Sequence, residues 1–203
     1  NIQVKIVVVG ACSNGKTSLI NRFVQNTFNP EYKATMGVDF MYKSVVVFDK
    51  DENCDQKVRL QIWDVAGQDR DNILTRSFYK DAQGCVIVVD LSNDEQEILN
   101  QIKSMTETIR QSLSSQFLHD PIPIIVSCNK ADMHDNAVKY SNEFKTQILG
   151  LGVKEVLQTS ALSGLNVDEI FQSIGQLSYP IAKTQNEIAQ TPNILESQTK
   201  TGC

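Results

Sequence analysis

The chain has 203 residues, a formal net charge of −5 and a pI of about 5.1, which suits one domain better than two. This acidic balance argues against non-specific nucleic-acid binding, which needs basic surfaces facing phosphate. The five cysteines are odd in number and show no metal-ligand spacing, so we expect a reducing, cytosolic compartment. No apolar run approaches the ~20 residues that span a bilayer, and we expect no signal peptide.

Strand and helix patterns alternate along the chain. Apolar, β-branched runs predict strands at about 3–9, 38–48, 57–64, 84–90, 123–129 and 154–158. Helical patterns occur at about 16–25, 70–80, 94–113, 137–149 and 166–178. A polar turn at 49–57 predicts an antiparallel hairpin of the second and third strands. The remaining βα units predict an α/β fold, a six-stranded mostly parallel sheet with helices on both faces.

The first motif joins the first strand to the first helix. Residues 10–17 read Gly-Ala-Cys-Ser-Asn-Gly-Lys-Thr, and such a P-loop turns consecutive backbone N–H groups toward phosphate oxygens at a helix N-terminus. Lys16 is predicted to reach the β- and γ-phosphates, and the Thr17 hydroxyl to bind Mg²⁺. The alternative is a chance glycine-rich turn, which the strand–loop–helix context disfavours. The loop indicates a P-loop nucleotide-binding fold without indicating the base.

The second motif follows the third strand. Asp64 ends that strand and can hold Mg²⁺ through water, although a strand-end aspartate can also be a helix cap or a turn residue. The backbone N–H of Gly67 can approach a γ-phosphate, and Gln68 is placed to orient an attacking water. Asp-x-x-Gly is weak alone, but downstream of a P-loop it indicates nucleotide hydrolysis.

The third motif predicts the base. The Asp132 carboxylate can accept hydrogen bonds from both N1–H and the exocyclic amine of guanine, a donor pair that adenine lacks on that edge. Lys130 is predicted to lie along the ring, and Asn129 to tie this loop to the P-loop. Ser160 and Ala161 follow a later strand and can offer a backbone N–H to guanine O6.

Residues 28–40 have turn chemistry and no helical period, so we expect a mobile loop. Thr35 is predicted to be a second hydroxyl ligand of Mg²⁺, engaged when the γ-phosphate is present. Phe28 can cover the edge of the base, or Phe28 and Tyr32 can simply pack on their own loop. Gln68 and Lys16 are the predicted catalytic residues, and Thr17, Thr35 and Asp64 the predicted metal ligands. The predicted nucleotide-binding residues are Ser13, Asn14, Gly15, Lys16, Thr17, Ser18, Phe28, Thr35, Gly67, Asn129, Lys130, Asp132, Ser160 and Ala161.

Over about 1–178 the sequence resembles the Ras superfamily of small GTPases, with five guanine-nucleotide motifs in order. Residues 35–40, 63–70 and 77–82 are similar to the Rab family in particular. The resemblance implies a GTP/GDP switch with Mg²⁺, slow intrinsic hydrolysis and control of vesicle or endolysosomal trafficking. It also implies a monomer that cycles between the cytoplasm and the cytosolic face of endosomal, lysosomal or other vesicle membranes.

The same resemblance implies partners: effectors, an exchange factor (GEF), an activating protein (GAP) and a GDP-dissociation inhibitor. Phe40, Trp63 and Tyr79 match the aromatic triad through which Rabs present their switch loops to effectors. Val65 and residues 57–63 are similar to the Rab branch that serves lysosome-related organelles.

The sequence departs from the family pattern at three places. Ser13 and Asn14 add side chains to the P-loop, where they are expected to crowd the γ-phosphate and slow hydrolysis, obstruct an activating partner or weaken nucleotide binding. Asp71 stands where Rabs usually carry phenylalanine, which should change the choice of effector or exchange factor. The chain ends in one cysteine, Cys203, and a single lipid there would give reversible membrane anchoring.

We therefore predict a GTPase domain over 1–178 and a flexible tail over 179–203. A hydrolysis-impaired pseudo-GTPase, which acts as a guanine-nucleotide-binding scaffold, is the alternative that the P-loop departures raise. A P-loop kinase or ATPase is disfavoured, because it needs a lid for its phosphoacceptor and no Asn-Lys-x-Asp motif.

Overall fold

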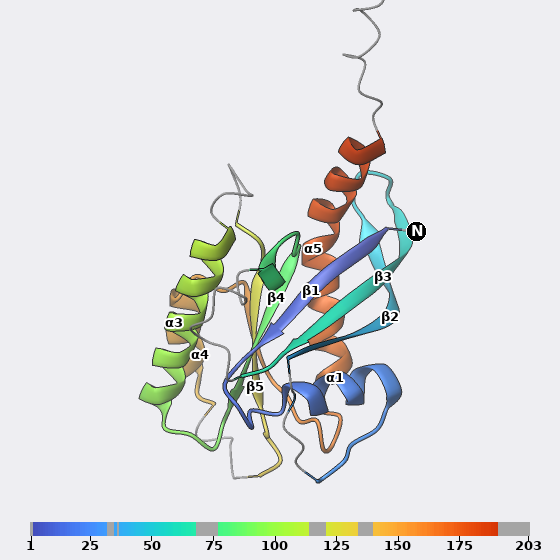
Figure 1. Ribbon diagram of the computed structural model, residues 1–203. Coiled ribbons are helices and arrows are strands. Elements are labelled where there is room, and N and C mark those ends of the chain that lie inside the picture. The colour runs from blue at the N-terminus through green and yellow to red at the C-terminus, as the bar shows by residue number, and fades with distance from the viewer. Residues whose placement is uncertain are drawn as a thin grey trace, which may run out of the picture.

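The structure is a computed structural model that describes residues 2–31, 35, 37–67, 77–113, 121–133 and 140–190. Within them a six-stranded sheet in the order β2-β3-β1-β4-β5-β6 carries helices on both faces (Figure 1). The strands are β1 Gln3–Val9, β2 Val38–Asp49, β3 Cys54–Val65, β4 Gly84–Asp90, β5 Ile124–Asn129 and β6 Glu155–Gln158. The helices are α1 Lys16–Gln25, α3 Glu95–Leu113, α4 Asn142–Gly150 and α5 Val167–Gln190. The predicted α/β fold class is confirmed.

The sheet is parallel except at one edge. β2 and β3 pair antiparallel from Val38↔Val65 to Asp49↔Cys54, which confirms the predicted hairpin. The other pairings are parallel. β4 and β5 are covered on both faces and read as nearly continuous apolar runs, as central parallel strands do. The carboxyl ends of β1, β3, β4, β5 and β6 therefore lie along one side of the sheet, where ligands of such folds bind.

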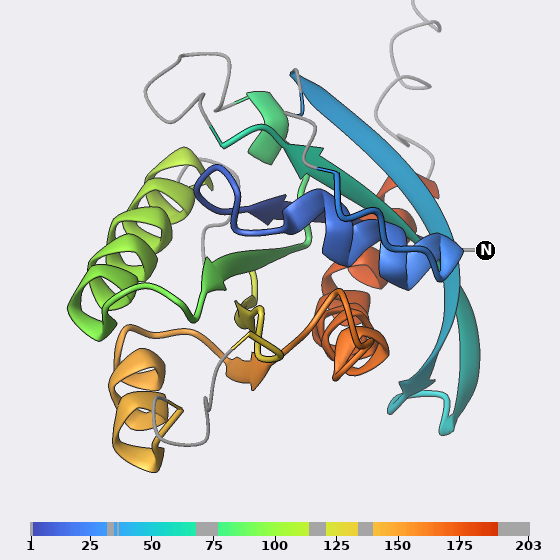
Figure 2. The ribbon, with the colours of Figure 1, turned by 90° about the horizontal axis from the view of Figure 1, so that it is seen from below.

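Two hydrophobic cores fix these strand ends in place. α1 and α5 pack on one face of the sheet and α3 and α4 on the other (Figure 2). On the first face Phe23 of α1 stacks on Phe171 of α5, with ring centroids 4.3 Å apart. On the second face Ile98, Ile102 and Ile109 of α3 are buried, so one face of this helix packs into the core.

Two predicted helices fall partly outside the described residues. Of the helix expected at 70–80, the structure describes residues 77–80, of which 77–79 are helical. The helix expected at 137–149 begins at Asn142 in α4. Ser141 caps it, because its hydroxyl accepts a hydrogen bond from Phe144 N at 3.0 Å.

The last helix is longer than predicted. α5 continues past residue 178 and through Pro180 to Gln190, so the expectation of a flexible tail from residue 179 is wrong for 179–190. The physical reason is an anchor on the distant hairpin turn: Tyr179 and Lys183 both bind the buried carboxylate of Asp49. Among the described residues, no helix is both long enough and apolar enough to cross a membrane.

Candidate nucleotide-binding site

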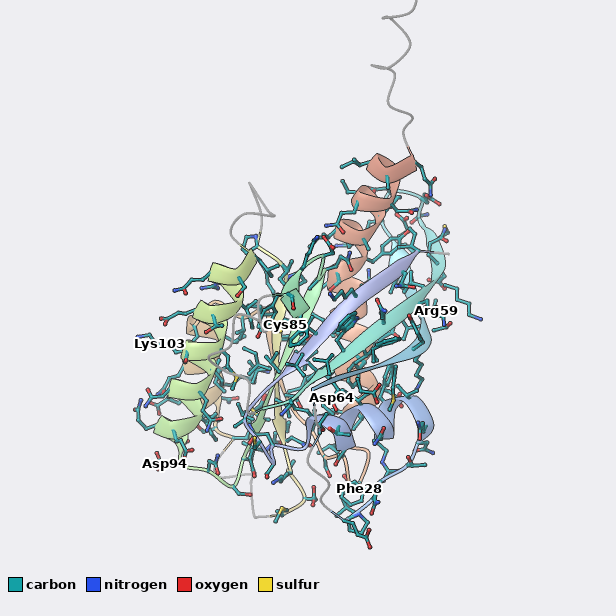
Figure 3. All side chains as sticks on the ribbon, viewed as in Figure 1. Phe28, Arg59, Asp64, Cys85, Asp94 and Lys103 are labelled. Carbon is teal, nitrogen blue, oxygen red and sulfur yellow. The ribbon has the colours of Figure 1, made fainter. Side chains whose placement is uncertain are left out.

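A cavity of about 700 Å³ lies at the carboxyl ends of the parallel strands. Its walls come from the P-loop, the loop after α1, and the loops after β5 and β6. Figure 3 shows Asp64 at the end of β3 beside the start of α1, and Phe28 on the loop that leaves α1. Of the predicted nucleotide-binding residues, all but Asn14 and Ser160 line the cavity. Residues that line it without having been predicted to do so are Cys12, Asn21, Asn29, Pro30, Glu31, Met133 and Leu162.

The backbone of the P-loop depends on glycine where it meets the base-binding loop. Gly15 has a φ of +86°, and a Cβ there would lie 2.5 Å from Asn129 Nδ2. That Nδ2 donates to Asn14 O at 2.9 Å, which is the tie between the two loops that the sequence predicted. A side chain at Gly15 would disturb this contact, so glycine supports the tie between the P-loop and the base-binding loop.

Lys16 lies inside the curve of the P-loop. Its side chain is buried, and Nζ donates to Gly10 O at 2.9 Å and to Ala11 O at 3.0 Å. A cation in this position faces the space where the loop N–H groups and the start of α1 favour anions. The arrangement can therefore neutralise phosphate oxygens.

Three oxygen-bearing side chains converge next to Lys16. Thr17 Oγ1 lies 2.8 Å from Thr35 Oγ1 and donates to Asp64 Oδ2 at 2.5 Å. The other carboxylate oxygen, Asp64 Oδ1, is buried and has no hydrogen-bond partner. Burial raises the pKa of Asp64, against the hydrogen bond from Thr17 and the charge of Lys16.

These oxygens fit a hard divalent cation, because Mg²⁺ prefers carboxylate and hydroxyl oxygens and keeps several waters. The described residues hold no group of three or more histidine, cysteine, aspartate or glutamate side chains that could bind a metal alone. A Mg²⁺ here would thus complete its coordination with phosphate oxygens and water, as in nucleotide sites.

The predicted base-binding residues are joined by hydrogen bonds. Asn129 Oδ1 accepts from Ala161 N at 3.2 Å and from Thr159 Oγ1 at 3.3 Å, which links the loops after β5 and β6. Ser160 does not line the cavity, but its hydroxyl donates to the Asp132 carboxylate. The carboxylate is thereby fixed in orientation at the cavity wall.

Two supporting residues carried no motif by which the sequence could have revealed them. Asp90, at the end of β4, binds Lys130 Nζ at 2.7 Å. Burial would raise the pKa of Asp90, but the hydrogen bonds from Lys130 and Ser92 outweigh it and lower the pKa. Arg22 of α1 donates to Ala161 O and to Leu162 O, both at 2.8 Å. It holds the base-binding loop against the helix that follows the P-loop.

The two added side chains of the P-loop behave differently. Asn14 is buried, and its Nδ2 donates to Val88 O of β4 at 2.8 Å. Its side chain therefore points away from the cavity, and the expectation that it crowds the γ-phosphate is wrong. Ser13 does line the cavity, with a positive φ of 64°, so its effect on the γ-phosphate stays a prediction.

Not every ring of the predicted aromatic triad is exposed at the surface. Phe40 is 48% exposed and stacks on Trp63, with ring centroids 5.7 Å apart. Tyr79 is only 4% exposed and packs in the core beneath α3, where burial raises its pKa. The prediction that Tyr79 offers its ring to effectors is therefore not met in this structure. Gln68, Asp71 and Cys203 lie outside the described residues.

Residues 5–179 match the model of the Ras family. The Ras-related protein Rab-32A of Dictyostelium discoideum is 35% identical over 168 residues, which cover 81% of this chain and 73% of the relative. The Ras-related protein Rab-7L1 of Rattus norvegicus is 38% identical over 137 residues, 66% of this chain and 62% of the relative. The Ypt/Rab-type GTPase ypt7 of Schizosaccharomyces pombe is 34% identical over 179 residues, 86% and 81% of the two chains.

These relatives bear different Rab names at comparable identities, so the branch within the Rabs stays a prediction. Nothing in the relatives or in the described residues favours a pseudo-GTPase. With the P-loop and the family match over most of its length, the chain belongs to the Ras family and is a Rab-like small GTPase.

Proposed function

We propose that the cavity binds GTP or GDP together with Mg²⁺, with the phosphates in the P-loop and the guanine against the loops after β5 and β6. The observation that carries this proposal is the layout of one cavity. Lys16 and Thr17 line one part of it, where Thr17 also binds Asp64, and the Asp132 carboxylate lies at the cavity wall on another loop. Its volume of about 700 Å³ is in the usual range for a small-molecule site.

At the phosphate end, Lys16 would pair with the β- and γ-phosphates, and Thr17 and Thr35 would hold the metal directly, with Asp64 holding it through water. When bound, Mg²⁺ would neutralise charge on the phosphate oxygens. Thr35 lies on the segment between α1 and β2, and its contact with the metal would be held in place by the γ-phosphate. Loss of that phosphate releases the segment, which makes the site a switch.

Hydrolysis needs positioning more than covalent chemistry. Gln68 orients the attacking water, while Lys16 and the loop N–H groups stabilise charge on the γ-phosphoryl group. We assign no arginine among the described residues to a position against that group. We infer that turnover alone is slow and that an activating protein supplies further positive charge, which in Ras is worth about 10⁵-fold.

At the base end, the Asp132 carboxylate accepts two hydrogen bonds from guanine. A base without that donor pair leaves the carboxylate with only the Ser160 hydroxyl as a partner, so the hydration that the carboxylate loses to the base is not repaid. The hydrogen bonds of Asn129 hold the loops after β5 and β6 against the P-loop. Phe28 lines the same cavity and covers the edge of the base.

The test of base selection is Asp132→Asn. An amide donates where guanine also donates, so we expect GTP affinity to fall by about a hundredfold and affinity for xanthosine triphosphate to rise. Fluorescent-nucleotide competition measures both constants. Asp168→Asn, whose aspartate is exposed on α5, is the control and should leave both unchanged. An unchanged preference for GTP in the Asp132 variant contradicts the proposal.

Partners and location follow from the same switch. Effectors, an exchange factor, an activating protein and a GDP-dissociation inhibitor read the switch loops together with Phe40 and Trp63, whose stacked rings lie on the β2–β3 surface. The protein cycles between the cytoplasm and the cytosolic face of endosomal, lysosomal or other vesicle membranes, with a prenyl group on Cys203. Mass spectrometry of the C-terminal peptide from native cells tests the lipid, and an unmodified Cys203 contradicts it.

A further inference from the structure

A second, smaller cavity lies behind the proposed metal ligands. It has a volume of about 50 Å³ and is enclosed by α1, β2 and β3. Thr17, Thr35 and Asp64 form part of its wall, so it adjoins the metal position. Asn21 and Asp39 add polar groups, and apolar side chains close the rest.

Asn21 belongs to no motif, yet its place in the fold is specific. It follows Thr17 by one helical turn, so both side chains lie on the same face of α1. Asn21 is also the one residue besides Thr17 and Thr35 that lines both this cavity and the large one. It thus stands between the nucleotide cavity and the space behind the metal.

Two residues that line this space carry buried acceptors without partners. Asn21 Oδ1 and Asp64 Oδ1 are both inaccessible to solvent and make no hydrogen bond. A buried acceptor without a donor is unfavourable, so native sites satisfy such atoms with ordered water. A water needs only ~15 Å³ and two to four polar partners, and the cavity offers both. A single water has two protons, which match the two acceptors.

We propose that Asn21 is a positioning residue for the metal, holding a Mg²⁺-bound water by a hydrogen bond to Oδ1 while the same water donates to Asp64 Oδ1. This inference rests on the proposed guanine-nucleotide and Mg²⁺ site. The water's oxygen faces the metal and its two protons face the protein. Asp64 alone would fix one proton and leave the water free to turn, whereas the pair fixes its orientation and strengthens the hold on Mg²⁺.

The experiment compares Mg²⁺ dependence among variants that differ in this acceptor. Asn21→Leu keeps the shape and loses the oxygen, whereas Asn21→Asp keeps an oxygen and loses the amide donors. Release of a fluorescent GDP analogue is followed while free Mg²⁺ is varied with a chelator. We expect Asn21→Leu to need about tenfold more Mg²⁺ for half-maximal retention, and Asn21→Asp to stay within about twofold of the natural protein or below it. Gln25→Leu, at an exposed position of the same helix, should match the natural protein.

Each outcome decides the matter. An unchanged Mg²⁺ requirement in Asn21→Leu overturns the inference, as does an equal loss in the Leu and Asp variants. If Asn21→Leu does not fold, Asn21→Ala takes its place with the same expectation. A crystal structure with GDP and Mg²⁺ supplies a readout without mutation, since a metal-bound water that misses Asn21 Oδ1 overturns the inference as well. Guanine-nucleotide binding by the natural protein that ignores Mg²⁺ overturns the proposed metal site itself, which separates the two failures.

Discussion

The close approach between the P-loop and the loop after β3 depends on the absence of a side chain at Gly67. A Cβ on Gly67 would lie 2.5 Å from Cys12 N and 2.7 Å from Ala11 C. Both are backbone atoms, so no side-chain rotation can relieve the overlap. The loop after β3 therefore rests directly on the P-loop, and glycine is the residue that permits it.

We expect Gly67→Ala to lower GTP affinity by about tenfold, because the two loops must separate to admit the methyl group. Titration with a fluorescent, non-hydrolysable GTP analogue measures the change. Gly150→Ala is the matched control, since a Cβ there meets no atom within 4 Å. Equal affinities for the natural protein and the Gly67 variant would show that this contact does not support the site.

At the scale of elements, helix α5 covers part of the sheet edge that β2 forms. Gln176 Nε2 donates to Phe48 O at 2.9 Å, and Phe48 N donates to Gln176 Oε1 at 2.8 Å, so the amide mimics a neighbouring strand. Gln172 Nε2 donates to Val46 O in the same way. Val46 and Phe48 are exposed apolar residues on this edge strand, and such an edge is otherwise a template for pairing with another chain.

We expect Gln176→Leu to lower the free energy of unfolding by about 1–3 kcal/mol, because two edge hydrogen bonds are lost, and to promote concentration-dependent association. Urea denaturation measures the first effect, and light scattering across a concentration series measures the second. Gln190→Leu, exposed at the end of α5, serves as control. A variant that stays monomeric and equally stable would mean that the edge needs no cover.

Much of the fold and site could be predicted because its signals are local. The P-loop, the Asp64 turn and the Asn129 loop each combine a strand end with a short motif, and the structure brings them around one cavity. What the sequence did not predict depends on contacts far apart in the chain. The side chain of Asn14 donates a hydrogen bond to β4, and Lys130 forms an ion pair with Asp90 at the end of a neighbouring strand. Val88 and Asp90, the partners of Asn14 and Lys130, lie far from them in the sequence and belong to no recognisable motif with them.

At the scale of the molecule, one carboxylate joins the hairpin turn to the C-terminal half of α5. Asp49 Oδ2 accepts from Tyr179 OH at 2.6 Å and from Lys183 Nζ at 2.8 Å, and Oδ1 accepts from Asp51 N and Glu52 N. The hydrogen bonds from Lys183 and Tyr179 hold the pKa of Asp49 well below its usual range. Burial and the hydrogen bond to Asp49 raise the pKa of Tyr179 to about 12.

The Asp49 carboxylate makes the free energy of unfolding depend on pH in the acid range. Its pKa is lower in the folded protein than the usual unfolded value of about 3.9, so its contribution is complete above that value and is lost as pH falls through the folded pKa. Asp49→Asn should therefore unfold at lower urea at pH 7, with a shallower loss of stability below pH about 4. Asp55→Asn, exposed on the same hairpin, should keep the natural profile. Parallel acid profiles for the Asp49 variant and the natural protein would contradict this linkage.

The long edge strand gives the molecule two poles. β2 runs for 12 residues, about 40 Å of extended chain, from Val38 near Thr35 to Asp49, which binds the C-terminal half of α5 (Figure 1). Any tether fixed beyond Gln190 therefore pulls at the pole opposite the nucleotide. In a protein held to a surface in that way, the nucleotide cavity faces away from the surface. A regulator can then reach the cavity without moving the tether.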